Sequence, residues 1–143
     1  MKLDPLYRIT FAYRERYGTG PERLLLAEGR CEGRLSGRFR AANRARLLPT
    51  GCWDPRLEGA VETDDGATVL LRLTGRGRPD EEPLGWVLAA ITHETEDPRY
   101  AWLNDTVGAV AGQVRPRAEV VLDVAALVWE PLPEPPRYDP GTA

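Results

Sequence analysis

The chain has 143 residues, 42% of them hydrophobic, and a formal net charge of −3 at pH 7. This length predicts one domain with a sizeable core, the hydrophobic fraction excludes wholesale disorder, and the acidic balance argues against a general nucleic-acid binder. Two cysteines, Cys31 and Cys52, are too few for a disulfide framework and are expected to be reduced thiols.

The start of the chain shows no apolar stretch behind Met1, so no secretory signal is expected. Nowhere does an apolar run approach the roughly 18 residues of a membrane helix. The sequence therefore predicts a cytoplasmic protein that has neither a membrane nor a nucleic acid as its partner.

Residues 6–17 alternate between apolar and polar positions. The apolar positions share one face: Tyr7, Ile9, Phe11 and Tyr13. This period of two is typical of a half-buried strand with an aromatic inner side. The glycines and the proline of residues 18–21 end the strand.

Residues 23–48 predict two strands that bend or bulge at glycines, because three glycines argue against a long helix. The glycines are Gly29, Gly33 and Gly37. Five arginines occupy even positions and would share one face of an extended chain: Arg34, Arg38, Arg40, Arg44 and Arg46. They form either a solvated outer face or a clamp for a planar anion.

A loop at residues 49–55 places Trp53 between turn-forming residues. This side chain either plugs the end of the core or walls a ligand pocket.

Residues 56–62 then enter an acidic bend, and residues 67–74 leave it. Asp65 followed by Gly66 before an alternating apolar run predicts a hairpin with a tight primed turn. Asp64 and Asp65 are either a carboxylate pair in which one pKa is raised for acid–base work, or side chains that only stabilise the turn.

The second half of the chain predicts further strands. Residues 75–83 read as an exposed loop, and residues 84–94 as an apolar strand. Residues 98–104 predict a short helical turn that begins at Pro98 and that Asn104 ends in left-handed geometry. Residues 105–114 and 117–128 are two closing strands. Five prolines among the last 14 residues predict an extended or disordered tail.

Together these elements predict an all-β fold with roughly eight antiparallel strands in a barrel and one short helical turn. Residues 1–129 would form this single domain, and residues 130–143 the proline-rich tail. Barrel closure leaves no exposed sheet edge, whereas an exposed edge strand would make a homodimer feasible.

Two stretches, in this order, resemble a known family. The first is the acidic bend, Glu62-Thr63-Asp64-Asp65-Gly66-Ala67, and the second runs Asp97-Pro98-Arg99-Tyr100-Ala101-Trp102-Leu103-Asn104. They are similar to the bacterial and fungal family catalogued as domain of unknown function 3237, over residues 6–128. The resemblance implies a single-domain antiparallel barrel of calycin-like shape and no settled activity. Where family members carry a Gly-Gly-x-Asp-Trp-like stretch, this chain has Gly51, Cys52, Trp53 and Asp54.

His93 is the only histidine, and its ordinary pKa lies near neutrality. At a barrel mouth it could act as general acid or base, oriented by Asp65 or Glu94; otherwise it is a structural histidine bonded to a neighbour. Tyr100, Trp102 and Asn104 either line a ligand pocket or plug one end of the barrel. One histidine and scattered acids give no metal-ligand spacing.

The sequence is interpreted as a small-molecule-binding barrel. The leading hypothesis is an enzyme without metal or cofactor that performs proton-transfer chemistry (cyclisation, isomerisation or hydrolysis) on a largely apolar compound of secondary metabolism. His93, Asp65 and Asp64 would carry protons, and Arg40 or Arg72 would hold an anionic group. The pocket walls would be Trp53, Tyr100, Trp102 and Asn104. The alternatives are a non-catalytic, lipocalin-like binding protein, and an interaction subunit that uses the proline-rich tail.

Overall fold

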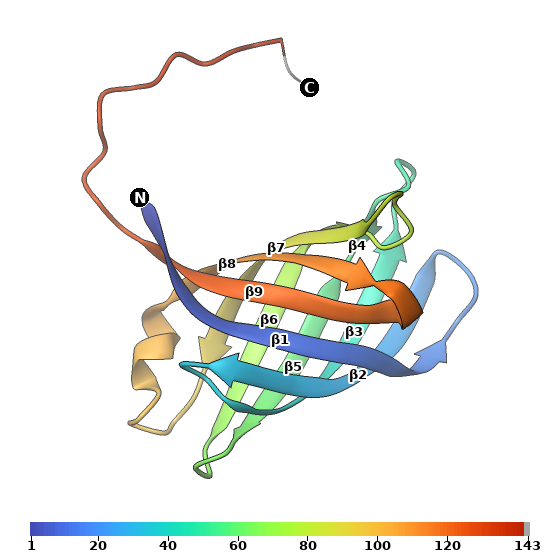
Figure 1. Ribbon diagram of the computed structural model, residues 1–143, viewed down its shortest axis with the longest axis horizontal. Helices are drawn as coiled ribbons and strands as arrows, with labels where there is room; N and C mark the ends of the chain where they lie inside the picture. Colours follow the sequence, from blue (N-terminus) through green and yellow to red (C-terminus); the bar gives the residue numbers. More distant parts are fainter. Residues whose placement is uncertain (142–143) are drawn as a thin grey trace.

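The computed structural model describes residues 1–141 and shows one antiparallel β-sheet closed into a barrel (Figure 1). The strands are β1 (Lys2–Tyr17), β2 (Glu22–Gly33), β3 (Gly37–Leu47), β4 (Trp53–Asp54), β5 (Arg56–Thr63), β6 (Thr68–Arg78), β7 (Gly85–Glu94), β8 (Val107–Arg115) and β9 (Glu119–Val128). Two short 3-10 helices, η1 (Ala101–Asp105) and η2 (Pro116–Ala118), complete the elements of the described residues.

Eight of the strands form the closed cylinder. Each long strand pairs with the next one along the chain, and β9 pairs back with β1, so the order around the barrel is β1-β2-β3-β5-β6-β7-β8-β9. The two-residue strand β4 pairs with both β3 and β6 at one end. The predicted all-β barrel is therefore confirmed.

The alternation along the strands decides what fills the barrel. Of the inner residues of β1, Tyr7, Ile9 and Phe11 are buried and Tyr13 is half-buried, and Phe39 and Ile91 are fully enclosed. Each such side chain stabilises the fold by about 1.5–3 kcal/mol relative to an exposed one. The even-numbered arginines of β3 are exposed on the outer face, which is the solvated arrangement of the two considered.

The strand irregularities are not where the glycines predicted them. Gly29 stays in regular pairing opposite Phe11, and a Cβ there would lie only 2.0 Å from the Thr10 carbonyl oxygen, so only glycine allows β1 and β2 to approach. The register shifts occur in β1 instead, between Pro5 and Tyr7 and between Tyr13 and Glu15. The second shift is a bulge, which turns the following side chains to the opposite face of the sheet.

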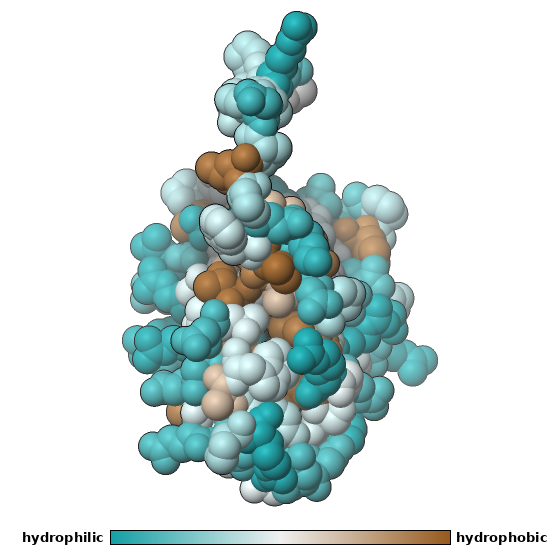
Figure 2. Space-filling view, turned by 90° about the vertical axis from the view of Figure 1, so that its left-hand side faces the viewer, coloured by the Kyte–Doolittle hydropathy of each residue, from teal (hydrophilic) through white to brown (hydrophobic). Residues whose placement is uncertain are grey.

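The two ends of the barrel differ. At one end, η1 and the β2–β3 loop cover the interior, and Leu103 and Leu35 are completely buried beneath them. We call this the closed end; it lies at the left of Figure 1, and Figure 2 views it face-on as a mostly hydrophilic surface with hydrophobic side chains gathered where the tail leaves. The β1–β2, β3–β4, β6–β7 and β8–β9 connections surround the opposite, open end.

Three local expectations were wrong. Strand β6 continues through Gly75 to Arg78, which were predicted as loop, because their backbone pairs with β7. Asn104 does not end η1 in left-handed geometry, since Arg117 and Ala118 are the only non-glycine residues of the described chain with positive φ.

The acidic hairpin also lacks a primed turn. Only Gly66 has a positive φ, of 90°, and its N–H donates to the Thr63 carbonyl at 3.1 Å. A glycine in this conformation allows a longer hairpin connection without requiring a positive φ at either aspartate.

Beyond Val128 the chain runs through Gly141 without a helix or strand, and Figure 1 shows it leaving the barrel beside the N-terminus. The last two residues of the predicted tail lie outside the described part. Within residues 1–141, no helix has the length and apolar character needed to cross a membrane.

Candidate functional site

The residues proposed from the sequence do not converge on one mouth. The acidic bend, His93 and residues 100–104 lie toward the closed end, whereas Trp53 lies at the open end. Arg40 and Arg72 are exposed on the outside of the barrel. The histidine, the acidic bend and residues 100–104 do share one end of the barrel, as expected, but this end is closed rather than an open mouth, and Trp53 lies at the other end.

At the closed end, Asp65 ties the acidic bend to η1. Its carboxylate accepts hydrogen bonds from the Thr63 hydroxyl at 2.6 Å and from the Tyr100 hydroxyl at 2.8 Å. The Arg99 guanidinium donates to the Asp65 carbonyl at 2.9 Å. These hydrogen bonds, that of Thr63 first, lower the pKa of Asp65. Asp65 is thus an anchor that is ionised at neutral pH, the opposite of a carboxyl group with a raised pKa.

The other proposed closed-end residues also have structural partners. Asp64 accepts hydrogen bonds from the exposed Arg30 guanidinium. The side-chain amide of Asn104 donates to the Thr95 carbonyl at 3.0 Å, and its oxygen accepts from the Thr95 N–H at 2.8 Å. Trp102 is covered by Arg34, whose Cζ lies 4.3 Å from the ring centroid. This arrangement plugs the end of the barrel.

His93 points into the core from β7. Its Nε2 lies 2.5 Å from the Tyr7 hydroxyl, and its Nδ1 is buried without a hydrogen-bond partner in the described residues. Burial lowers the pKa of His93 to about 4 and raises that of Tyr7. Both groups are therefore neutral at pH 7, and neither Asp65 nor Glu94 orients the imidazole.

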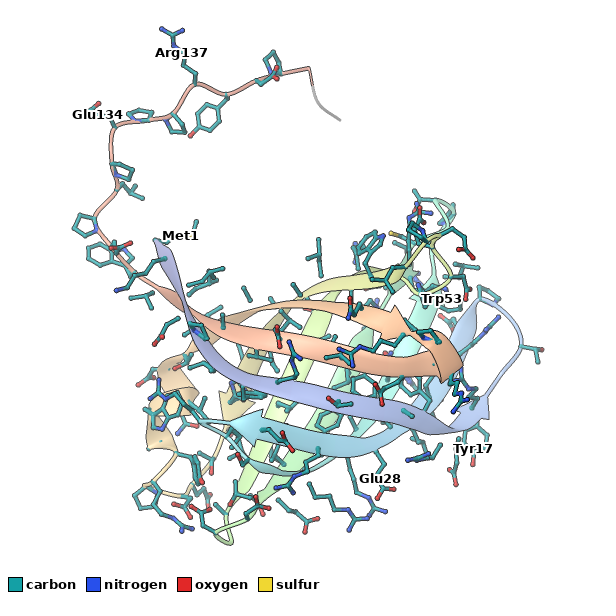
Figure 3. The ribbon with its side chains drawn as sticks, viewed as in Figure 1. Met1, Tyr17, Glu28, Trp53, Glu134 and Arg137 are labelled. Atoms are coloured by element: carbon teal, nitrogen blue, oxygen red, sulfur yellow. The ribbon has the colours of Figure 1, made fainter. Side chains whose placement is uncertain are left out.

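A groove of about 1160 Å³ lies over β2, β3, β5, β6 and β7, and its lining includes four of the residues proposed from the sequence: Arg40, Arg72, His93 and Asn104. Two of its three arginines are paired: Arg40 lies 3.9 Å from Glu28, and Arg72 lies 3.5 Å from Glu58. Figure 3 shows Glu28 on the outer side of the barrel. Because the groove is open to water and both Arg40 and Arg72 already have glutamate partners, it is a weak candidate for small-molecule recognition.

The open end contains a cavity of about 350 Å³ inside the barrel. Its walls are aromatic and aliphatic side chains on the inner faces of the strands: Phe11, Tyr13, Leu57, Leu73, Val87, Val114, Val120 and Leu122. We call it the open-end cavity. Its size and apolar lining match those of small-molecule sites, which span roughly 300–1,000 Å³.

One polar pair interrupts the apolar wall. The Asn43 amide donates to the Tyr13 hydroxyl oxygen at 2.9 Å, and the Asn43 oxygen accepts from the Arg56 N–H at 3.0 Å. The amide is thereby fixed, and the Tyr13 O–H is left to donate elsewhere. Burial raises the pKa of Tyr13, so the phenol stays protonated at neutral pH and acts as a hydrogen-bond donor.

The mouth of the open-end cavity is formed by Trp53, Arg16, Arg23 and Asp80. Arg23 lies over the Trp53 ring, with its Cζ 4.9 Å from the centroid, and Arg16 lies 5.6 Å from the Tyr13 centroid. Figure 3 shows Trp53 at this end of the barrel, with Tyr17 on the rim below it. Of the two roles considered for Trp53, the structure places it in a pocket wall.

Sequence reasoning missed four of these residues. Asn43 had a visible signal, because it is the polar residue among the inner, odd-numbered positions of β3. Tyr13 and Arg23 likewise fall on inner positions of their strands. Arg16 had no such signal in the sequence, because the bulge after Tyr13 reverses the alternation of inner and outer positions.

No family model matches the chain, and no curated protein matches it. Solved structures share its fold. A β-barrel-like protein from Acinetobacter baumannii AYE is 24% identical, with a TM-score of 0.76 over 87% of this chain and 94% of that one. A conserved protein of unknown function from Rhodopseudomonas palustris is 21% identical, with a TM-score of 0.77 over 89% and 97%. An enzyme from Penicillium herquei is 16% identical, with a TM-score of 0.60 over 86% and 93%.

Proposed function

We propose that this barrel binds a small, largely apolar molecule in the open-end cavity. The observation that carries the proposal is the combination of a cavity of about 350 Å³ with one oriented polar pair, Tyr13 and Asn43, in an apolar wall. Apolar walls supply affinity, and a few fixed polar groups set orientation. An interaction subunit that works through its tail would need no such cavity, so the cavity favours a ligand-binding role.

The test compares two substitutions on the same strand. Ala45 faces the open-end cavity, whereas Ala42 borders the outer groove. N-phenyl-1-naphthylamine, a neutral dye that brightens in apolar sites, should bind the unmodified protein. Ala45→Phe should weaken binding about tenfold by occupying the cavity, and Ala42→Phe should leave it unchanged. The reverse result would locate the ligand in the outer groove and refute the proposal.

We further propose that the bound molecule undergoes proton-transfer chemistry in which the Tyr13 hydroxyl, without giving up its proton, donates a hydrogen bond to the oxygen that gains negative charge. The support is a protonated phenol whose oxygen is held by Asn43 while its O–H remains free. Such a donor can stabilise negative charge that develops on a carbonyl oxygen. The enzyme among the structural neighbours is compatible with catalysis in this fold. Tyr13→Phe should retain binding and abolish turnover of a compound identified by screening; full turnover would leave the non-catalytic binding protein as the function.

We also propose that the chain belongs to the family catalogued as domain of unknown function 3237. The support is the contact between the two resembling stretches, since Asp65 accepts hydrogen bonds from Tyr100 across 35 residues of sequence. Their joint presence is then explained by one structural task, which is closing this end of the barrel. Homologous sequences in which Asp65 and Tyr100 vary independently would contradict the assignment.

A further inference from the structure

We infer that the molecule bound in the open-end cavity carries a carboxylate, which Arg16 and Arg23 hold at the mouth. The inference rests on the proposed function and adds the chemical class of the ligand, an aromatic or similarly flat body with one carboxylate.

Arg23 is held in place at the cavity mouth. It is half-buried at an inner position of β2, its guanidinium lies over the Trp53 ring, and its Nε donates to the Gly20 carbonyl at 3.1 Å. Stacking and one hydrogen bond fix the plane of the guanidinium, so its terminal N–H groups are oriented before a ligand arrives. A preorganised fork of this kind suits a carboxylate.

Arg16 reaches the same rim because of the bulge in β1. After the register shift between Tyr13 and Glu15, Arg16 pairs with Leu25, which lines the cavity. Arg23 lies two residues from Leu25 on the same face of β2. Diagonal neighbours of this kind are about 7–8 Å apart, within reach of long side chains. Both guanidiniums can therefore approach one carboxylate.

Arg16 and Arg23 are the arginines that line the open-end cavity, and within residues 1–141 they have no charge partner, as is also true of Arg14 and Arg44 on the outer face. On the outer surface, Arg8 pairs with Asp123 at 2.6 Å and Arg38 with Glu28 at 3.0 Å. Within residues 1–141, no carboxylate lies within 4.0 Å of Arg16 or Arg23. Two unpaired cations beside a low-dielectric cavity attract an anion.

The acidic residue of the mouth lies across the opening. Asp80 belongs to the β6–β7 connection, and β6 and β7 are on the side of the barrel away from β1 and β2. The mouth is therefore polarised, with its positive charge on the β1–β2 side. The aromatic rings of Phe11, Tyr13 and Trp53 line the space beyond it, which favours a flat ligand body.

The experiment uses two probes that differ in charge alone, 2-naphthoate and 2-naphthamide, titrated calorimetrically into the full chain at pH 7.5 and low salt. The unmodified protein should bind the carboxylate about tenfold more tightly than the amide, because charge-assisted hydrogen bonds form with the carboxylate only. Arg16→Gln and Arg23→Gln should each remove about tenfold of carboxylate affinity and leave amide affinity unchanged.

Arg44→Gln is the matched control. Arg44 is exposed on the outer face of β3 near the same end, and its loss changes the net charge equally. Equal losses in Arg44→Gln, or equal affinities of the unmodified protein for the two probes, would overturn the carboxylate inference. If Arg23→Gln loses affinity for both probes, the substitution has damaged the cavity itself. The carboxylate inference is then decided by Arg16→Gln, because Arg16 is exposed.

The neutral dye separates this inference from the proposed function. If the dye binds and neither naphthalene probe does, the carboxylate inference fails while the binding function stands. If the dye does not bind either, the proposed function fails with it.

Discussion

Protonation of His93 should destabilise the fold as the pH falls below neutrality. The imidazole is 6% exposed, its Nδ1 has no partner in the described residues, and burial lowers the pKa of His93 from its ordinary 6.5 to about 4. Because the folded-state pKa is the lower one, the unfolded chain binds the proton first. The stability is therefore fully present above pH 6.5 and is lost as the pH falls through about 4.

The magnitude follows from the two pKa values. One pH unit between them corresponds to about 1.4 kcal/mol, so about 3 kcal/mol of unfolding free energy is lost by pH 4. This is a large fraction of the roughly 5–15 kcal/mol that stabilises a typical domain. The buried phenol of Tyr7 adds no compensating negative charge, because burial raises its pKa.

The assay is urea unfolding between pH 7.5 and pH 4, compared with His93→Gln, which does not titrate but can accept a hydrogen bond from Tyr7. Carboxylates protonate in both proteins over this range, so the difference between the two isolates His93. The advantage of the unmodified protein should shrink by about 3 kcal/mol. The single histidine also gives one assignable imidazole NMR signal. A His93 pKa between 6 and 7 in the NMR titration would refute a dry, closed end. A stability difference between the two proteins that does not change with pH would refute it as well.

Three further predictions concern other parts of the chain. Ala118 has a φ of 59° in the β8–β9 turn, so Ala118→Gly should raise the free energy of unfolding by about 1 kcal/mol. Ala111→Gly in the regular strand β8 should lower it by about 0.5–1 kcal/mol. If both substitutions lower the free energy of unfolding, the left-handed turn at Ala118 is contradicted. Asp65→Asn should speed amide hydrogen exchange in η1, because it weakens the contacts of Asp65 with Tyr100 and Arg99. Asp64→Asn should not, because it affects only the exposed pair with Arg30. Equal exchange rates in the two variants would contradict the role of Asp65 as the anchor of η1. Burial raises the pKa of Cys31 to about 12, so iodoacetamide should alkylate native protein at the half-buried Cys52 first, and early modification of Cys31 would show that the barrel opens.

Strand alternation made the barrel predictable. A side chain on a strand points to one of two faces, so the aromatic positions of β1 and the apolar positions of β6 identified the interior without any knowledge of their partners. The same logic put the arginines of β3 outside. It failed at Gly75–Arg78, where composition resembled a loop but the backbone is paired with β7.

The candidate site was far less predictable. Residue chemistry drew attention to His93 and to the two aspartates, yet their surroundings give them structural tasks: His93 bonds to Tyr7, and Asp65 anchors η1. Tyr13 was assigned correctly to the inner face, but only the fold shows that Asn43 lies beside it and that empty space lies in front of it.

By itself, the sequence determined that this chain is all-β, that its strands are antiparallel neighbours and which apolar side chains of β1 and β6 face inward, because these properties depend on local period and turn chemistry. Only the tertiary structure decided which end of the barrel is closed, where the cavity lies and which arginines reach it. Those depend on how loops pack over the rims and on a one-residue bulge in β1, which moves Arg16 to the inner face. A shift of one residue leaves no mark in composition, but it reverses the direction of every side chain that follows.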